Sequence, residues 1–335
     1  MTTMTGMQAR KTRTAKTLSA FIDYAARQGL VVDDDGMTLY DALVGGGLNY
    51  RVETASLLAE QATPRGVETV PMETHRAVLR VNPDGTKVGL SVVQSRYATV
   101  QNTDAFAFLQ TLIDNREADL VAVSAYGLVP GQQAFVAMHL PEPMLLADSE
   151  EVLDVYLVAR NSHDGNSKFT VAVVPVRADG SIVETNIPRY PQQWAMTHSG
   201  NVANKLNDAI TTMRRVEEWQ TAYQRVSSRM LSTPLSSNDF ARIVRALLPT
   251  PAGASDRSAD EWAKRRRSME NLFDKAPKQN FGAGTVYAGF AAVCSWVDLH
   301  APGKVDAAAA RQSRIINGTA AKMKRQAWDM LSRHN

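Results

Sequence analysis

Cysteine and long apolar runs are scarce in this chain of 335 residues. The one cysteine, Cys294, excludes an intramolecular disulfide and any metal site that is built from several cysteines. No apolar run approaches the ~18–20 residues of a membrane-spanning helix, so we expect no membrane partner. The basic first residues are not followed by the apolar core of a secretion signal, and a reducing cytoplasm is the compartment that fits this composition best.

Motifs of catalysis and of metal binding are missing as well. None of the six histidines has the H-x-x-x-H spacing of a zinc site, and no G-x-S-x-G motif of a serine hydrolase occurs. Gly45, Gly46 and Gly47 are not followed by the Lys-Ser/Thr of a phosphate loop, so we interpret them as the end of a short helix that Thr38 caps. We therefore name no catalytic residue and expect neither a metal ion nor another cofactor.

The net charge of +3 is too small to indicate a partner, but charge is unevenly distributed along the chain. Residues 1–17, 264–267 and the segment from 303 onward are basic, whereas residues 31–63 and 141–154 are acidic. Such runs are compatible with an ordinary solvated surface. They are equally compatible with alternating acidic and basic faces, which suit self-association into a homo-oligomer and a basic track for a polyanion.

Strand patterns dominate the first two hundred residues. Alternating apolar residues and turn-forming Pro, Asp, Asn and Gly predict three β-hairpins, at residues 75–93, 120–140 and 152–177. Residues 97–100 and 182–187 are expected to extend the same sheet. Apolar residues at helical spacing predict a single helix over 102–115.

Helical periodicity takes over after Pro191. Residues 202–230 carry one apolar stripe, which predicts a long helix that packs on its own sheet or on another subunit. Shorter helices are expected at residues 237–248, 260–273, 284–300 and 307–332. We therefore predict an α+β fold, in which an antiparallel hairpin-rich sheet packed by helices is followed by a mostly helical C-terminal region.

Three parts of the chain are expected from this order. Residues 1–36 would form a flexible arm with basic and acidic residues, and residues 37–199 an antiparallel β-sheet α+β domain. Residues 200–335 would form a helical region with a basic tail, in which the segment from Lys304 adds electrostatic capture of a polyanion.

The most concentrated polar cluster is the loop at residues 161–167, N-S-H-D-G-N-S. Asn, Asp, Gly and Ser are turn formers, so the loop can be a hairpin turn alone. It can also contact phosphate through His163, Lys168 and backbone amides. A third interpretation is that Asp164 orients His163 for acid–base chemistry.

Basic residues interleaved with aromatics lie near the ends of the predicted strands. Proteins that bind single strands need a cationic groove and flat side chains on which bases stack. The side chains that we expect to contact phosphates and bases are Arg96, Tyr97, Arg160, His163, Lys168, Arg177 and Arg189.

Several sequence segments resemble the motifs of one family, in the right order. These are T-L-Y-D-A-L and G-G-L-N-Y-R-V-E within residues 38–53, S-R-Y-A-T-V-Q-N-T-D-A-F at 95–106, N-S-H-D-G at 161–165, and G-T-V-Y-A leading to D-L-H within 284–300. They resemble the phage/plasmid-like protein family, a domain of unknown function numbered 932. Residues 176–187 depart from the R-V-V-C-x-N-T segment that is common in that family, so no role tied to that segment is transferred.

The resemblance implies a phage or mobile-element gene and hence a host bacterial cytoplasm, but no particular activity. The expected layout is similar to that of phage single-strand annealing proteins of the Red-beta, RecT and Erf type, which form rings and hold DNA in a basic groove without metal or nucleotide chemistry. By this analogy we expect an oligomeric DNA-binding protein that anneals single strands in recombination or replication. Two alternatives stay open: a phage enzyme or host-takeover factor that uses the His163–Asp164 loop, and a protein-interaction module that binds a host protein without nucleic acid.

Overall fold

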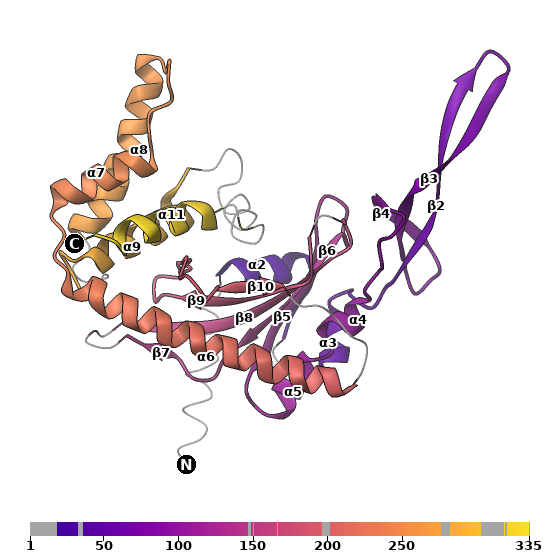
Figure 1. Ribbon diagram of the computed structural model, residues 1–335, viewed down its shortest axis with the longest axis horizontal. Coiled ribbons are helices and arrows are strands. Elements are labelled where there is room, and N and C mark those ends of the chain that lie inside the picture. The colour runs from indigo at the N-terminus through magenta and orange to yellow at the C-terminus, as the bar shows by residue number, and fades with distance from the viewer. Residues whose placement is uncertain are drawn as a thin grey trace.

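The computed structural model describes residues 19–32, 36–146, 149, 151–165, 167–195, 202–275, 282–302, 318 and 320–334. In these residues every strand pairing is antiparallel, and the strands form two sheets (Figure 1). Most of the helical residues follow the last strand. The predicted α+β fold with a helical C-terminal region is confirmed.

The larger sheet has the strand order β1-β5-β6-β8-β9-β10, and β7 pairs with β8. Its strands are β1 (Leu30–Val31), β5 (Asp119–Tyr126), β6 (Gln133–His139), β7 (Met144–Leu145), β8 (Val152–Ser162), β9 (Thr170–Val176) and β10 (Gln193–Ala195). The second and third predicted hairpins are therefore present as β5–β6 and β8–β9. Alternate residues of β8 enter two separate core clusters, with Val155 and Leu157 in one and Tyr156 and Val158 in the other, so both faces of the sheet are covered there.

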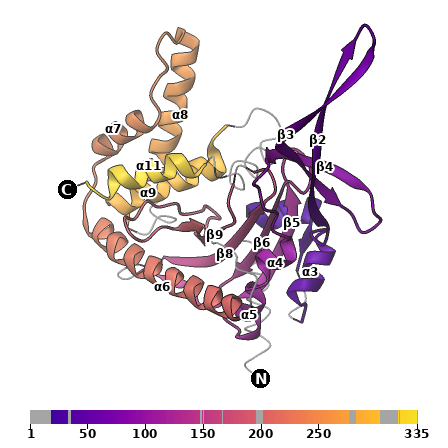
Figure 2. The same ribbon diagram turned by 45° about the vertical axis from the view of Figure 1, so that its right-hand side comes forward.

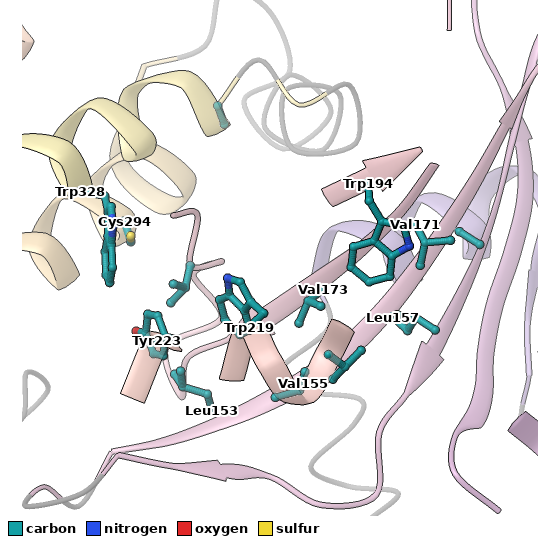
Figure 3. Close-up of a cluster of buried hydrophobic side chains, with 14 of the residues drawn as sticks. Leu153, Val155, Leu157, Val171, Val173, Trp194, Trp219, Tyr223, Cys294 and Trp328 are labelled. Atoms are coloured by element: carbon teal, nitrogen blue, oxygen red, sulfur yellow. The ribbon is translucent and has the colours of Figure 1, made fainter. Parts of the chain in front are cut away.

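Helices cover the two faces of this sheet. Helix α2 (Ser19–Gln28) lies against β5, where Ala25 is fully buried. Helix α6 (Val202–Ser232) crosses the opposite face, and its Trp219 belongs to the same core cluster as Val155 and Val173. Figure 3 shows Trp219 between Tyr223 and Val173. The apolar stripe of the long helix thus packs on its own sheet, the first of the two alternatives expected for it.

The smaller sheet consists of β2 (Arg51–Thr63), β3 (Gly66–Val81) and β4 (Lys87–Gln94) in that order. The β3–β4 hairpin and its turn agree with the first predicted hairpin. Strand β2 and the outer half of β3 were not predicted. They pair with each other beyond the end of β4 and project away from the rest of the molecule (Figures 1 and 2). The register of β2 and β3 shifts between Ser56 and Leu58, where the projecting part begins.

Short helices connect the two sheets. In α3 (Leu39–Gly45), the Thr38 hydroxyl accepts a hydrogen bond from the Asp41 N–H at 3.1 Å, and Gly46 closes the last turn, as expected. The helix predicted over 102–115 is instead two helices, α4 (Asn102–Phe106) and α5 (Leu109–Asp114). In one continuous helix Phe106 and Phe108 would point in nearly opposite directions, because each residue advances the helix by ~100°. The break lets both rings pack edge-on against Phe169.

The remaining C-terminal elements are α7 (Ser237–Leu247), α8 (Asp256–Lys275), α9 (Val286–Ser295), the π-helical turn η1 (Trp296–His300) and α11 (Ala321–Leu331). The helix predicted over 284–300 thus changes to π geometry after Ser295. None of the helices in the described ranges is both long and apolar enough to cross a membrane.

Some expectations differ from the structure. Residues 97–100 lie in a loop, and the stretch 182–187 contributes only one isolated bridge, between Ile182 and Val176. Residues 1–18 of the expected arm and 303–317 of the basic tail lie outside the described residues. The part of the arm that is described, 19–32, is packed on β5 through α2 and β1, because Tyr24 and Ala25 bury apolar surface there. The division of the chain at residues 36 and 199 stays a prediction.

Candidate nucleic-acid interface

A concave site of about 990 Å³ opens on the α2 face of the larger sheet. Its floor is formed by β8, β9 and β10, and its wall by residues 184–193 and the first turns of α11. The described lining includes four basic side chains and one acidic side chain: Arg160, Lys168, Arg189, Arg325 and Glu184. We call this site the basic groove. Its lining has an excess of positive charge, which favours an anionic ligand.

Three of the seven predicted contact residues meet in the basic groove. Arg160 pairs with Thr170 across the β8–β9 ladder, and paired residues of an antiparallel ladder share a face of the sheet. Lys168 precedes β9 by two positions and is exposed. Arg189 is exposed in the loop before β10 and has a φ of 70°, a left-handed conformation that is unusual for a residue with a side chain.

The loop that carries Arg189 is held to the sheet by Gln192. Its side-chain Nε2 donates to the carbonyl oxygens of Val173 at 2.9 Å and Val183 at 2.8 Å, and its Oε1 accepts from the Thr185 N–H at 2.8 Å. All the side-chain atoms in this arrangement are buried. The wall of the basic groove is therefore formed before any ligand arrives, so binding need not order it.

The other side of the groove is fixed by a buried ion pair. Lys324 Nζ donates to Asp298 Oδ2 at 2.6 Å and to the carbonyl oxygen of Ile182 at 2.9 Å, and both side chains are at most 1% exposed. The next residue of α11 is Arg325, and its Nη1 lies 3.2 Å from Glu184 Oε2. Burial raises the pKa of Glu184, although Lys324, Arg325 and Arg160 act in the opposite direction. A carboxyl group with a raised pKa in a concave site is typical of functional sites.

Glu184, Gln192 and Arg325 were not predicted from the sequence. Glu184 and Arg325 are 141 positions apart and meet only because α11 returns to the end of β9. The one signal available was the basic character of the C-terminal segment, which includes Arg325. No pattern in the sequence identified Gln192 as the residue that fixes the loop.

His163 is buried, so the structure does not place its side chain at the surface of the basic groove, where a ligand contact was predicted. Its Nε2 lies 3.1 Å from Asn102 Oδ1. Its backbone N–H donates to the carbonyl oxygen of Gln132 at 2.7 Å, and its own carbonyl oxygen accepts from Ser91 Oγ at 2.7 Å. Burial lowers the pKa of His163 to about 4, and the neighbouring Asp164 opposes this shift. The ring is thus neutral at physiological pH and enclosed by protein.

Asp164 organises the polar loop itself. Its Oδ1 accepts from Ser162 Oγ at 2.6 Å and from the Ser167 N–H at 3.3 Å, while its Oδ2 accepts from Gln133 Nε2 at 2.9 Å. Gly165 follows with a φ of 75°, which glycine adopts without strain. These contacts are those of a hairpin turn, and they do not place Asp164 against the His163 ring nitrogens as an orienting carboxylate.

Arg177 is also buried and lies outside the lining of the basic groove, although it was predicted to contact nucleic acid. It forms an ion pair with Glu151, in which both side chains are at most 3% exposed, and it donates to Ser295 Oγ at 3.3 Å. The residue lies just past the end of β9, where α9 covers it, and a buried guanidinium needs such partners. Glu151, Tyr287 and Asp179 raise the pKa of Arg177 against the effect of desolvation, so the group stays charged.

Arg96 and Tyr97 lie in the loop after β4, outside the lining of the basic groove. Arg96 is exposed. Tyr97 is half-buried, and its hydroxyl donates to the carbonyl oxygen of Ser162 at 3.2 Å. The structure therefore does not bring these two residues together with Arg160, Lys168 and Arg189 in one site.

A comparison with protein families gives one match. The sequence model of the family described as Domain of unknown function (DUF932) matches residues 89–328, which include the polar loop and all the charged groups of the basic groove. Of the resembling segments, those within 38–53 precede the match. Comparisons with curated proteins and with solved structures found no match. Because the match covers most of the sequence, the chain belongs to the family Domain of unknown function (DUF932).

Proposed function

We propose that the chain is encoded by a phage or another mobile element and that it binds single-stranded DNA in the host cytoplasm as a homo-oligomer such as a ring. In this proposal it promotes annealing of complementary strands during recombination or replication. The observation that supports it is the basic groove, where Arg160, Lys168 and Arg189 line one concave face.

The lining of the groove favours contact with the sugar–phosphate backbone. Beside the basic groups it has neutral hydrogen-bonding side chains such as Thr170, Asn186 and Gln193, which are typical phosphate ligands. Tyr126 is the aromatic residue of the described lining, and it is 5% exposed, so it offers little surface for base stacking. Binding through phosphates alone is insensitive to sequence, which annealing of arbitrary strands requires.

The proposal is tested by fluorescence anisotropy with a labelled single-stranded oligonucleotide over a series of salt concentrations. The variant Lys168→Gln/Arg189→Asn removes two exposed charges, and asparagine tolerates the left-handed backbone at position 189. We expect weaker binding and a salt slope that is shallower by about 1.4, since each lost phosphate contact on a single strand contributes about 0.7.

The matched control is Arg257→Gln/Arg267→Gln on α8, which removes the same charge from exposed positions outside the groove lining. It should leave the slope nearly unchanged. Equal losses in both variants would show that only the total charge matters and would overturn the groove as the site. An annealing assay with two complementary oligonucleotides, run with a chelator and without nucleotide, then tests whether the chain accelerates pairing.

A further inference from the structure

The outer part of the β2–β3 pair, residues 57–74, is an exposed two-stranded ribbon that we call the distal arm. Strand β4 pairs with β3 only from His75 onward, and the Ser95 N–H donates to the carbonyl oxygen of Thr74 at the base of the arm, so beyond Thr74 the distal arm is held by β2–β3 pairing. Figures 1 and 2 show it extending away from both sheets. An isolated two-stranded ribbon is marginally stable in water, which indicates that the distal arm functions against another surface.

Both faces of the distal arm carry aliphatic side chains. The ladder pairs Leu58 with Pro71 and Ala62 with Val67 on one face, and Ala59 with Val70 on the other. Leu58, Val67 and Val70 are 54%, 67% and 52% exposed. Exposing such apolar side chains to water is unfavourable, and their clustering on a projecting element is typical of an interaction surface.

The β2 edge of the distal arm carries few of the residues that block pairing with another strand. Along its whole length β2 contains neither proline nor lysine, the residues that commonly block an open edge, and Glu60 is the one charge between Leu57 and Thr63. The other strand has Pro71, Glu68 and Glu73. The β2 edge is therefore the side on which additional main-chain hydrogen bonds can form.

Charge and area favour a second copy of this chain as the partner. The distal arm has three glutamates and one arginine, a net charge of −2, and because the whole chain has a net charge of +3, the rest of the chain carries +5. The arm of one copy and the body of another are therefore opposite in charge. At ~3.3 Å per residue and ~4.8 Å between strands, each face of the distal arm offers about 250 Å². Two arms exchanged between copies and covered on both faces would bury about 2,000 Å² in total, the size of a stable interface.

We propose that the distal arm is the surface through which one copy of the chain binds the next. This inference rests on the self-association in the proposed function and assigns its site. Sedimentation velocity of the full chain over a range of concentrations tests it. The wild type should associate, and Val67→Thr/Val70→Thr should raise the dissociation constant of the assembly at least ~10-fold, because anchoring side chains dominate interfaces.

A matched pair of single variants separates the distal arm from apolar surface in general. Val70 and Val92 are 52% and 54% exposed, and Val92 lies on β4 outside the distal arm. Val70→Thr should weaken association, whereas Val92→Thr should not. A wild type that stays monomeric, or arm variants that associate like the wild type, would overturn the proposal.

A crosslinking experiment identifies the partner directly. Cys294 is fully buried and burial raises the pKa of its thiol to about 12, so a cysteine introduced as Val67→Cys would be the reactive thiol of the chain. It is labelled with a photoactivatable crosslinker in a mixture of ¹⁴N and ¹⁵N chains. Crosslinks between isotopically different copies support the proposal, and crosslinks confined to one copy contradict it.

Oligonucleotide binding by the same samples distinguishes the two proposals. If wild type and Val67→Thr/Val70→Thr differ in mass but neither binds a single strand at low salt, the distal arm assignment stands and DNA binding fails. If both bind a single strand with the same mass, DNA binding stands and the distal arm assignment fails.

Discussion

The Nε2 atom of His163 lies 3.1 Å from the Oδ1 atom of Asn102 in the interior of the protein. Asn102 Nδ2 donates to the carbonyl oxygen of Leu48, so Oδ1 is the acceptor and His163 carries its proton on Nε2. Oδ1 also accepts from Asn161 Nδ2 at 3.0 Å. One side chain thus links the polar loop after β8, the start of α4 and the segment that leads into β2.

Replacing Asn102 by alanine should therefore destabilise the fold strongly. The change leaves the Asn161 amide, the His163 ring and the Leu48 carbonyl each without this partner in a buried site. We expect a loss of about 3 kcal/mol in the free energy of unfolding, since one orphaned buried polar group costs ~1–3 kcal/mol. Chemical denaturation measures it, with the exposed neighbour variant Thr103→Ala as a control that should change little. A loss below that of the control would contradict the role of this network.

Acid should destabilise the protein through His163. Its pKa of about 4 in the folded state lies below the usual 6.5, so the unfolded chain binds the proton more readily. As far as His163 is concerned, the free energy of unfolding is highest above pH 6.5. It falls as the pH decreases toward 4, by about 3 kcal/mol in total. In His163→Gln, which keeps an N–H donor but does not titrate, that part of the pH dependence should vanish. Parallel stability curves for the two proteins would exclude the effect.

We expect Arg177 to contribute to the stability of the fold and not to the affinity for single-stranded DNA. Arg177→Met leaves Glu151 buried without its ion-pair partner, and we expect a loss of about 3–5 kcal/mol in unfolding free energy. Adding Glu151→Gln should recover part of it. At a temperature where Arg177→Met is folded, its affinity for a single-stranded oligonucleotide should equal that of the wild type. A selective loss of affinity without a loss of stability would restore Arg177 as a contact residue.

Glu184 should make binding of a polyanion dependent on pH. Its carboxyl group is the acidic group of the described groove lining, and its pKa is raised, so it loses its charge at a higher pH than an ordinary glutamate. Wild-type affinity for single-stranded DNA should therefore rise as the pH falls toward that pKa. Glu184→Gln should bind about fivefold more tightly at neutral pH, by removal of roughly 1 kcal/mol of repulsion, and should lack this rise. Anisotropy titrations at several pH values measure both effects.

The hairpins and helices of the fold were predictable because their signals are local. Period-two apolar patterns and turn residues mark β3–β4, β5–β6 and β8–β9, and the apolar stripe marks α6. Strand β2 escaped prediction for a physical reason: its distal part is exposed on both faces, so no face had to be apolar and no alternation arose. The break between α4 and α5 depends on Phe169, which is distant in sequence.

The residues of the candidate site also differ in how well local sequence patterns predict their positions. Arg160 lies near the end of β8, Lys168 just before β9 and Arg189 before β10, so the strand pattern alone placed all three near strand ends. Whether a polar residue is buried depends on partners elsewhere in the chain, and the partners of Arg177 include Ser295, 118 positions away. For His163 the decisive partner is Asn102, and no pattern within the polar loop indicates it.

The shift in register between Ser56 and Leu58 lies where the ribbon leaves the three-stranded sheet. Four residues of β3, at positions 72–75, here face Leu57 of β2 alone. Extra residues in one strand bend a strand pair and tighten its twist, so this irregularity, which we call the elbow, sets the direction in which the whole ribbon points. The angle between successive subunits, and with it the curvature of a ring or filament, would then be encoded by this elbow, separately from the side chains that make the contact.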